Sequence, residues 1–327
     1  MLIAAYNEEK YIEEKIESIL ALDYPTEKIE ILIGSDGSVD KTDEIVSKFV
    51  NNRLSLFRQQ IREGKPLVLN SLVSHAKNEI LVFSDARQRL DKNCLKHLVV
   101  NFSDKTIGSV SAQLIFQDDG GNKGIGLYWN YEKFIRNSES KLASMLGATG
   151  ALYAIRKELF TLLPENLILD DVYIPLKVVE KNYRAIFEPR AIIYDHIAES
   201  PKGEFLRKVR TLAGNFQIFG LLKGLFNPFK SSVAFQLFSH KFLRLTVPYL
   251  LVCLFISNIF ILNNAFLKTF FYLQVIFYSL AFFGIFIKRT SKLIDIANMF
   301  CVMNWAAVVG LYGFLTHKQE VAWEKTS

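Results

Sequence analysis

The chain has 327 residues, of which 50% are hydrophobic and 22% are charged, and its mean hydropathy is +0.18. This mixture argues against a purely soluble protein and against a wholly membrane-embedded one, and it favours a soluble domain joined to a membrane region. The net charge of +6 comes without a cluster of lysines, so a cationic membrane face explains it better than a nucleic-acid partner does.

The chain begins in an apolar run, Leu2–Ala5, which predicts a buried strand already under way at the first residue. The run ends by Tyr6 and does not have the pattern of a cleavable signal peptide. We therefore expect further N-terminal sequence to precede this chain in the natural protein.

Strands and helices then alternate as far as Asp91. Apolar residues at helical spacing predict a helix over 12–20, which ends before Tyr24-Pro25. Further strands are predicted at Ile29–Ile33, Leu54–Phe57 and Ile80–Phe83, a loop at Gly34–Ser38, and helices over 45–50 and from about Pro66. Such alternation predicts the α/β class, with a mostly parallel sheet covered on both faces.

Polar residues follow three of these strands, after Ala5, Ile33 and Phe83. In a parallel sheet the ligand site lies at the carboxyl ends of the strands. We therefore expect these polar groups to converge in space.

The pattern is less regular beyond Asp91. We expect a polar surface turn at Asp118–Asn122, a helix around Leu127–Ile135, a small apolar stretch at Gly147–Ile155 and a helix at Arg156–Leu162. Another helix should begin at Leu169-Asp170-Asp171, and Arg184–Tyr194 contains two strand-like runs on either side of Pro189.

The last third of the chain has the character of a membrane region. Phe216–Phe238 is aromatic and amphipathic, which predicts a helix in the membrane interface. Leu245–Leu262, Thr269–Ile287 and Ile296–Leu315 carry no charged residue, and each is close to the ~20 residues that cross a bilayer. The sequence thus predicts a catalytic domain at 1–215, an interface segment at 216–240 and a transmembrane region with a short tail at 241–327.

The connector between the second and third apolar segments predicts the topology. Residues 288–292 are basic, so they should be cytoplasmic. Three crossings then put residues 1–215 in the cytoplasm as well, and they leave the tail from His317 outside. Cys94, Cys253 and Cys301 form no disulfide framework, which fits a reducing compartment.

Six short motifs occur in order along the first two-thirds of the chain: 4–8 (AAYNE), 35–40 (SDGSVD), 64–66 (GKP), 83–86 (FSDA), 147–150 (GATG) and 169–171 (LDD). Their order and spacing resemble the family 2 glycosyltransferases, which have the nucleotide-sugar-binding GT-A fold. The C-terminal apolar segments make the chain similar to the membrane-bound bacterial polysaccharide synthases of that family.

The resemblance implies a set of donor-binding residues. Tyr6, Asn7, Glu8 and Asp36 would hold the nucleoside, with Asp36 accepting a hydrogen bond from a uracil, and Lys65 would approach the diphosphate. A turn residue before Gly37 is the plainer interpretation of Asp36, and a solvated surface lysine that of Lys65.

Asp85 stands at the position of the family's first metal-site aspartate, which implies a bound Mg²⁺ or Mn²⁺. Members of the family usually have a second aspartate two residues later, where this chain has Arg87. Arginine cannot coordinate such a cation. Either Asp85 binds the metal without help from residue 87, or Arg87 neutralises the diphosphate itself.

Asp170 and Asp171 align with the family's catalytic carboxylates. Asp171 would take the proton from the acceptor hydroxyl as it attacks, which inverts the configuration of the sugar, and Asp170 would be its neighbour or a helix cap. Arg210 matches an arginine found in processive synthases and could bind diphosphate, or it could face lipid headgroups. The neighbouring tryptophan of those enzymes is Thr211 here, which weakens the case for a long-chain polymerase.

The favoured function is sugar transfer from a nucleotide-sugar donor, expected to be a UDP-sugar, to a glycan or lipid-linked acceptor at the cytoplasmic face of the cell membrane. A close alternative adds a single sugar to a lipid carrier without polymerising. A hypothesis from another class is a degenerate transferase that serves as a membrane scaffold or as a nucleotide-sugar-binding protein.

Overall fold

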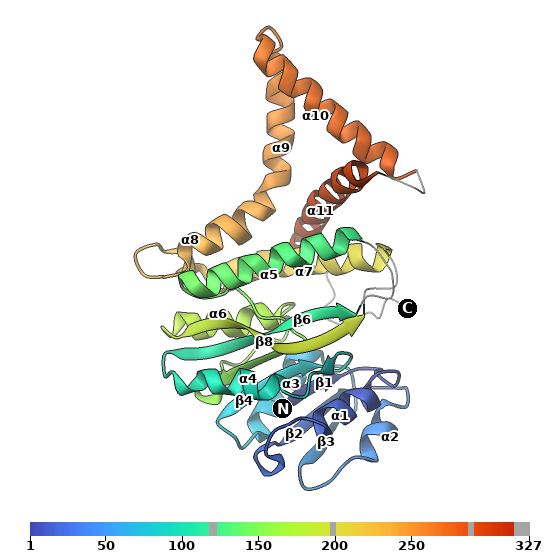
Figure 1. The fold of residues 1–327 in the computed structure, drawn as a ribbon, viewed down its shortest axis with the longest axis vertical. Helices are drawn as coiled ribbons and strands as arrows, with labels where there is room; N and C mark the ends of the chain where they lie inside the picture. Colours follow the sequence, from blue (N-terminus) through green and yellow to red (C-terminus); the bar gives the residue numbers. More distant parts are fainter. Residues whose placement is uncertain (118–122, 197–200, 287–290, 317–327) are drawn as a thin grey trace.

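A computed structural model describes residues 1–117, 123–196, 201–286 and 291–316. The predicted turn at Asp118–Asn122, most of the basic connector and the tail from His317 lie outside the described residues. Figure 1 shows a sheet domain at one end of the molecule, the long helices α9 (Leu243–Phe260) and α10 (Ala265–Gly284) at the other, and further helices between them.

The sheet has eight strands within the described residues, in the order β3-β2-β1-β4-β7-β6-β8-β5. Their bounds are β1 Leu2–Ala5, β2 Ile31–Asp36, β3 Leu54–Gln59, β4 Ile80–Asp85, β5 Arg89–Leu90, β6 Ile107–Gln117, β7 Leu152–Arg156 and β8 Arg184–His196. β3, β2, β1 and β4 are parallel, β7 is antiparallel to β4 and β6, and β6 is parallel to β8. The prediction of a mostly parallel α/β sheet is therefore confirmed.

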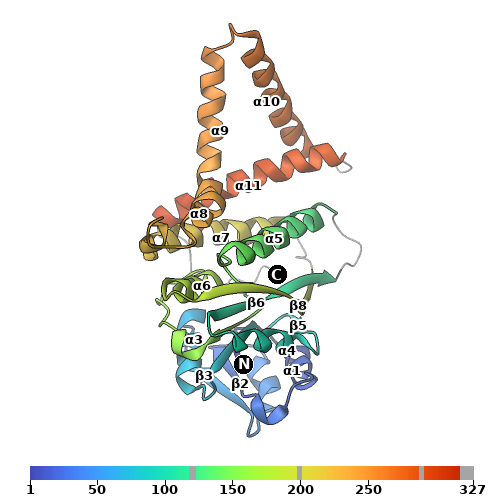
Figure 2. The same ribbon diagram turned by 60° about the vertical axis from the view of Figure 1, so that its left-hand side comes forward.

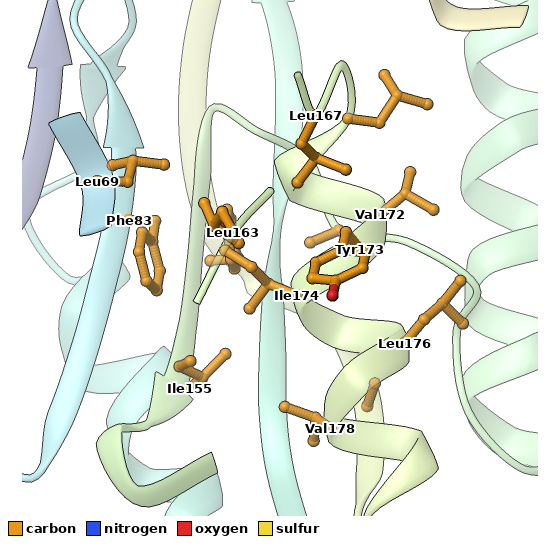
Figure 3. Packing of buried hydrophobic residues seen from close by; sticks show 14 of the residues in the cluster. Leu69, Phe83, Ile155, Leu163, Leu167, Val172, Tyr173, Ile174, Leu176 and Val178 are labelled. Atoms are coloured by element: carbon orange, nitrogen blue, oxygen red, sulfur yellow. The ribbon is translucent and has the colours of Figure 1, made fainter. Parts of the chain in front are cut away.

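Helices cover both faces of the sheet because side chains alternate along each strand. On β1, Leu2 and Ala4 join one buried cluster while Ile3 and Ala5 join the other. The first cluster lies under α3 (Lys65–His75) and α6 (Asp170–Glu180); the second lies under α1 (Ile12–Leu20), α2 (Thr42–Ser47) and α4 (Cys94–Val99). Figure 3 shows Ile174 and Val178 of α6 on the side of the helix toward Phe83, which lies on β4.

Three local predictions differ from the structure. β2 extends to Asp36, so the expected loop begins later than Gly34. Only a single 3₁₀ turn, Lys157–Leu159, forms where a helix to Leu162 was expected, since the backbone is extended again at Phe160. The two runs around Pro189 are one strand, whose pairing with β6 jumps from Glu188 to Ile192 because proline cannot donate to the ladder.

The expected interface helix at Phe216–Phe238 is not a single helix. α7 (Pro201–Leu221) ends before a 3₁₀ turn at Lys223–Phe226, and helical structure resumes only with α8 (Ala234–Gln236). Gly224 and the Asn227-Pro228 pair explain the break, because both lower helix stability. In Figures 1 and 2 α7 lies beside α5 (Lys123–Leu142), between the sheet and the long helices.

Within the described residues, three helices are long and apolar enough to cross a membrane: Ala234–Phe260, which includes α9 (Leu243–Phe260), then α10 (Ala265–Gly284) and Leu293–Leu315, most of α11 (Lys292–Leu315). They correspond to the three predicted segments. Only 6% of an apolar 18-residue stretch of α10 is buried inside the protein, as expected for a helix that faces lipid. α9 and α10 point away from the sheet domain, whereas α11 packs on α7 through Ala306 and Ala307 (Figure 2).

Candidate functional site

The ends of β1, β2 and β4 meet at one edge of the sheet. Ala4 is paired with Asp85, and Ala5 is paired with Ser35. The polar residues that follow these strands therefore converge, as predicted. A pocket at this edge is lined by Ala4, Ala5, Tyr6, Asp36, Arg62 and Lys65.

Tyr6 and Arg62 form a stack within the pocket. The guanidinium carbon of Arg62 lies 3.9 Å from the centroid of the Tyr6 ring, a cation–π distance. The sequence motifs did not identify Arg62, since it lies in the loop between β3 and α3, outside every matched segment. A flat aromatic ring beside a guanidinium is a suitable surface for a nucleobase.

Asp36 holds the loop that carries Arg62. Its Oδ1 accepts a hydrogen bond from the backbone N–H of Glu63 at 2.7 Å, and its Oδ2 accepts one from Gly64 at 3.0 Å. Gly64 has a φ of 99°, which favours glycine at this turn. The carboxylate thus has a structural task besides the predicted contact with a base, and either oxygen can accept a further bond.

Asn7 and Glu8 link the first two strand-end loops. The backbone N–H of Val39 donates to Asn7 Oδ1 at 2.9 Å, and that of Glu8 donates to Thr42 Oγ1 at 2.7 Å. Neither residue lines the pocket. Their observed contacts support the loops, and nucleoside contact remains a prediction for both.

Lys65 lies between two carboxylates. Its Nζ is 2.8 Å from Asp85 Oδ1 and 3.1 Å from Asp170 Oδ1, and Tyr153 Oη donates to Asp170 Oδ2 at 3.4 Å. Burial alone would lower the pKa of Lys65, but the charges of Asp170 and Asp85 outweigh burial and raise it. Lys65 is therefore a charged residue of the site and not a solvated surface lysine.

Asp171 follows at the start of α6 and lies beside Gly150 and Asp85. A Cβ at Gly150 would lie 3.3 Å from Asp85 Oδ2 and 3.4 Å from Asp171 Oδ2. Two carboxylates thus border the space that the missing side chain leaves. Burial, and then the charge of Asp170, raise the pKa of Asp171 to about 6, against the opposing charge of Lys65. Such a carboxylate is suited to accept a proton near neutral pH.

Arg87 contacts β8. Its Nη2 donates to Asp195 Oδ2 at 2.6 Å, and Gln88 Nε2 donates to the same oxygen at 3.0 Å. Asp195 is buried, so the pair compensates a charge that would otherwise be costly. The structure thus gives Arg87 a partner in the protein, and its predicted contact with diphosphate remains untested.

A buried lysine supports the Asp85 loop from behind. Lys15 Nζ donates to Ser84 Oγ at 2.6 Å and to the carbonyl of Gln88 at 3.0 Å, and Ser84 Oγ donates to the carbonyl of Ala151 at 2.6 Å. Burial lowers the pKa of Lys15 to about 7. Lys15 lies beside Ile16 and Ile19 on the apolar stripe of α1. A lysine on such a stripe is the feature of the sequence from which its buried position could have been predicted.

Arg210, on α7, completes the charged site. Its Nε is buried and has no hydrogen-bond partner within the described residues, and its charge acts on Asp170, Asp171 and Asp85. α7 is held close to these acids because Gly214 packs against Leu169: a Cβ there would lie 2.5 Å from Leu169 Cγ. Contact of Arg210 with a diphosphate or with a lipid headgroup remains a prediction.

A divalent cation fits this site only as one shared with the donor. No group of three or more His, Cys, Asp or Glu side chains that could hold a metal occurs in the described ranges. Asp85 Oδ2 lies beside Gly150, while Oδ1 binds Lys65. Mg²⁺ is commonly held by one or two carboxylates together with substrate phosphates, so Asp85 is a suitable single protein ligand.

Comparison with known proteins gives a consistent result. Residues 1–163 match the family model "Glycosyl transferase family 2". The poly-beta-1,6-N-acetyl-D-glucosamine synthase of Staphylococcus aureus (strain COL) is 26% identical over 243 residues, 70% of this chain and 57% of that protein. The synthase of the same name from Staphylococcus epidermidis is 24% identical over 262 residues, 77% of this chain and 63% of that protein. The chain therefore matches somewhat more than half the length of these relatives.

A solved structure shows the same fold over nearly the whole chain. It is the mannosyltransferase PcManGT from Pyrobaculum calidifontis in complex with GDP-Man and Mn²⁺, with a TM-score of 0.77 and 22% identity. The match covers 97% of this chain and 86% of that one, membrane-type helices included. The sheet domain of the present chain is thus a GT-A-like domain.

Proposed function

Residues 1–163 form a glycosyl transferase family 2 domain, and from this premise we propose that the chain is a membrane-anchored, inverting glycosyltransferase. It would move a sugar from a nucleotide-sugar donor to a glycan or lipid-linked acceptor. The observation that carries the proposal is the position of Asp85 and Asp171, whose Oδ2 atoms would lie 3.3 and 3.4 Å from a Cβ at Gly150.

The residues of the site divide the reaction between them. The Tyr6–Arg62 stack would hold the nucleobase, and Lys65 and Arg210 would meet the diphosphate as charge-assisted donors. Asp171 would take the proton of the acceptor hydroxyl while its oxygen attacks the anomeric carbon and the bond to the diphosphate breaks. Attack from the side opposite the leaving group inverts the configuration.

A divalent cation would be held by Asp85 together with the donor phosphates, and it would stabilise the charge of the leaving diphosphate. The similarity to poly-beta-1,6-N-acetyl-D-glucosamine synthases supports UDP-GlcNAc as the first donor to test. We further propose that residues 1–215 face the cytoplasm, on the basis of the basic connector at 288–292.

The test uses membranes that contain the full chain, incubated with radiolabelled UDP-GlcNAc, UDP-glucose or GDP-mannose. We expect transfer from one of these donors, lost in Asp171→Asn and kept in Asp23→Asn, which removes an exposed carboxylate far from the site. Nucleotide binding without hydrolysis or transfer of any donor would contradict the proposal and support the degenerate-transferase alternative.

A further inference from the structure

The helix α5 carries charged residues that the transfer chemistry does not use. Glu132, Arg136 and Glu139 recur at spacings of four and three, so they share one face of the helix. Glu132 and Glu139 are only 8% and 6% exposed. A buried carboxylate is costly unless it is paired, so both need partners from the element packed on that face.

The partners come from the segment that leads into the first membrane-spanning helix. Arg244 Nη2 donates to Glu132 Oε1 at 2.9 Å, and His240 Nδ1 lies 2.6 Å from Glu139 Oε1. Gln236 Nε2 adds hydrogen bonds to the carbonyls of residues 139 and 144. These contacts fix the segment against α5 on both sides of Arg136.

Two further cations, Arg136 and Lys241, lie between these contacts. Arg136 is between the two glutamates, and Lys241 is between His240 and Arg244 on the facing segment; both are half-buried. Neither side chain makes a hydrogen bond or ion pair with any part of the chain that the structure describes. Lys241 is acted on by the two glutamates as well as by Arg244 and Arg136, and the charge of Arg136 also acts on Asp171. Each glutamate already has a partner on the facing segment, and the cations Arg136, Lys241 and Arg244 outnumber the two carboxylates. An anion bound at Arg136 and Lys241 would offset this excess of positive charge.

We propose that Arg136 and Lys241 bind the phosphate groups of a lipid-linked sugar acceptor, with the acceptor hydroxyl directed toward Asp171. This inference rests on the proposed function and names its acceptor class. Guanidinium suits phosphate through paired hydrogen bonds, and a lysine suits it as a point charge. Exposed phenylalanines on the same elements, Phe134 and Phe238, offer apolar surface for the lipid chain beside the membrane helices.

The direct test measures binding of farnesyl diphosphate to the full chain in phosphatidylcholine nanodiscs, with no sugar donor present. We expect Arg136→Gln and Lys241→Gln each to weaken binding about tenfold or more, since each removes a charge-assisted bond to phosphate. Arg136→Lys should restore most of the affinity. Lys141→Gln on α5 and Lys230→Gln in the interface segment remove exposed charges and serve as matched controls.

Competition distinguishes the possible sources of phosphate. Farnesyl diphosphate should be displaced poorly by inorganic diphosphate and by phosphatidylglycerol in the nanodisc. If either compound displaces farnesyl diphosphate as well as unlabelled farnesyl diphosphate does, the lipid-linked assignment is overturned. Equal binding by wild type and both glutamine variants would overturn it as well. If binding depends on the two cations but the chain transfers no sugar, the transferase proposal is contradicted and the lipid-binding inference is not.

A second arm links the site to catalysis. With GlcNAc joined to a farnesyl chain through a diphosphate as acceptor, Arg136→Gln should raise the KM for acceptor about tenfold and leave the KM for donor unchanged. With the same sugar on an uncharged alkyl ether, wild type and Arg136→Gln should behave alike. A wild type that uses both acceptors equally well would contradict the inference.

Discussion

The carboxylate of Asp171 leads to a quantitative prediction, the loss of sugar transfer in weakly acidic buffer. A general base must be ionised, and burial together with Asp170 raises the pKa of Asp171 to about 6. With this pKa, roughly 97% of the carboxylate is ionised at pH 7.5 and roughly 9% at pH 5.0. Turnover at saturating donor and acceptor should therefore fall about tenfold between the two values.

Asp171→Asn removes the base and nearly preserves the shape of the side chain. A positioned base contributes about 10²- to 10⁴-fold to the rate, or roughly 3 to 5.5 kcal/mol of the barrier, so the variant should lose that much turnover. Its residual rate should not decline further at pH 5.0.

The stability of the fold should change in the opposite direction. The pKa of Asp171 is about 6 in the folded chain against 3.8 for an ordinary aspartate, so the protonated form favours folding. That stabilisation is complete below pH 3.8 and is lost as the pH rises through 6. At pH 7.5 Asp171→Asn should therefore have a higher melting temperature than wild type.

The assay follows initial rates from pH 5.0 to 8.5 in detergent or nanodiscs, with Asp23→Asn as the control for a surface carboxylate. A wild-type rate that is the same at pH 7.5 and 5.0, or an Asp171→Asn variant that keeps the acidic decline, would refute the assignment of the base. A melting temperature lower than wild type at pH 7.5 would contradict the stability argument.

Further predictions concern space, packing and charge. Gly150→Ala should lower kcat/KM at least tenfold without lowering the melting temperature, because its Cβ would lie 3.3 and 3.4 Å from the two carboxylates; Gly220→Ala, where nothing lies within 4 Å, is the control. Gly310→Leu should lower thermal stability by about 1–3 kcal/mol, because a Cβ there already meets Ala213 N at 3.1 Å; unchanged calorimetric melting would argue against tight packing of α11 on α7. Lys65→Met should weaken donor binding about tenfold in titration calorimetry, and donor binding as tight as wild type would remove Lys65 from the diphosphate site. Thorough chelation should abolish transfer, and transfer that persists would favour protein cations in place of a metal.

The arrangement of the strand ends was predictable because it follows from the simplest pattern in the sequence. Short apolar runs such as Leu2–Ala5 are closed by polar residues, and parallel strands bring those residues to one edge. Asp36, Lys65, Asp85 and Asp171 all lie at or near that edge, at positions that the family motifs also mark.

The partners of these residues were not predictable, because they depend on contacts between distant segments. Arg87 finds Asp195, which is 108 residues away along the chain, so its local sequence could not decide between a diphosphate and a protein partner. Arg62 reaches Tyr6 only because Asp36 binds the backbone of residues 63 and 64. Lys15 lies on an apolar stripe, where side-chain type alone gives no hint of its hydrogen bonds.

In the membrane region, too, some features were predictable from the sequence and others were not. Apolar length alone predicted three spans, and the three helices are present. The segment before them has an amphipathic composition, which predicted one continuous helix. Gly224 and Pro228 interrupt that helix. The packing of α11 on α7 depends on small residues at matching positions, Gly310 and Ala213, which periodicity does not reveal.

The configuration of the product at its new glycosidic bond tests the central claim most directly. The full chain would be incubated with an α-linked UDP-sugar and acceptor, and the anomeric carbon of the isolated product would be examined by NMR. Direct displacement assisted by Asp171 predicts a β-linked product from wild type and none above background from Asp171→Asn. A product that keeps the α configuration of the donor, or no product from any donor, would contradict the account.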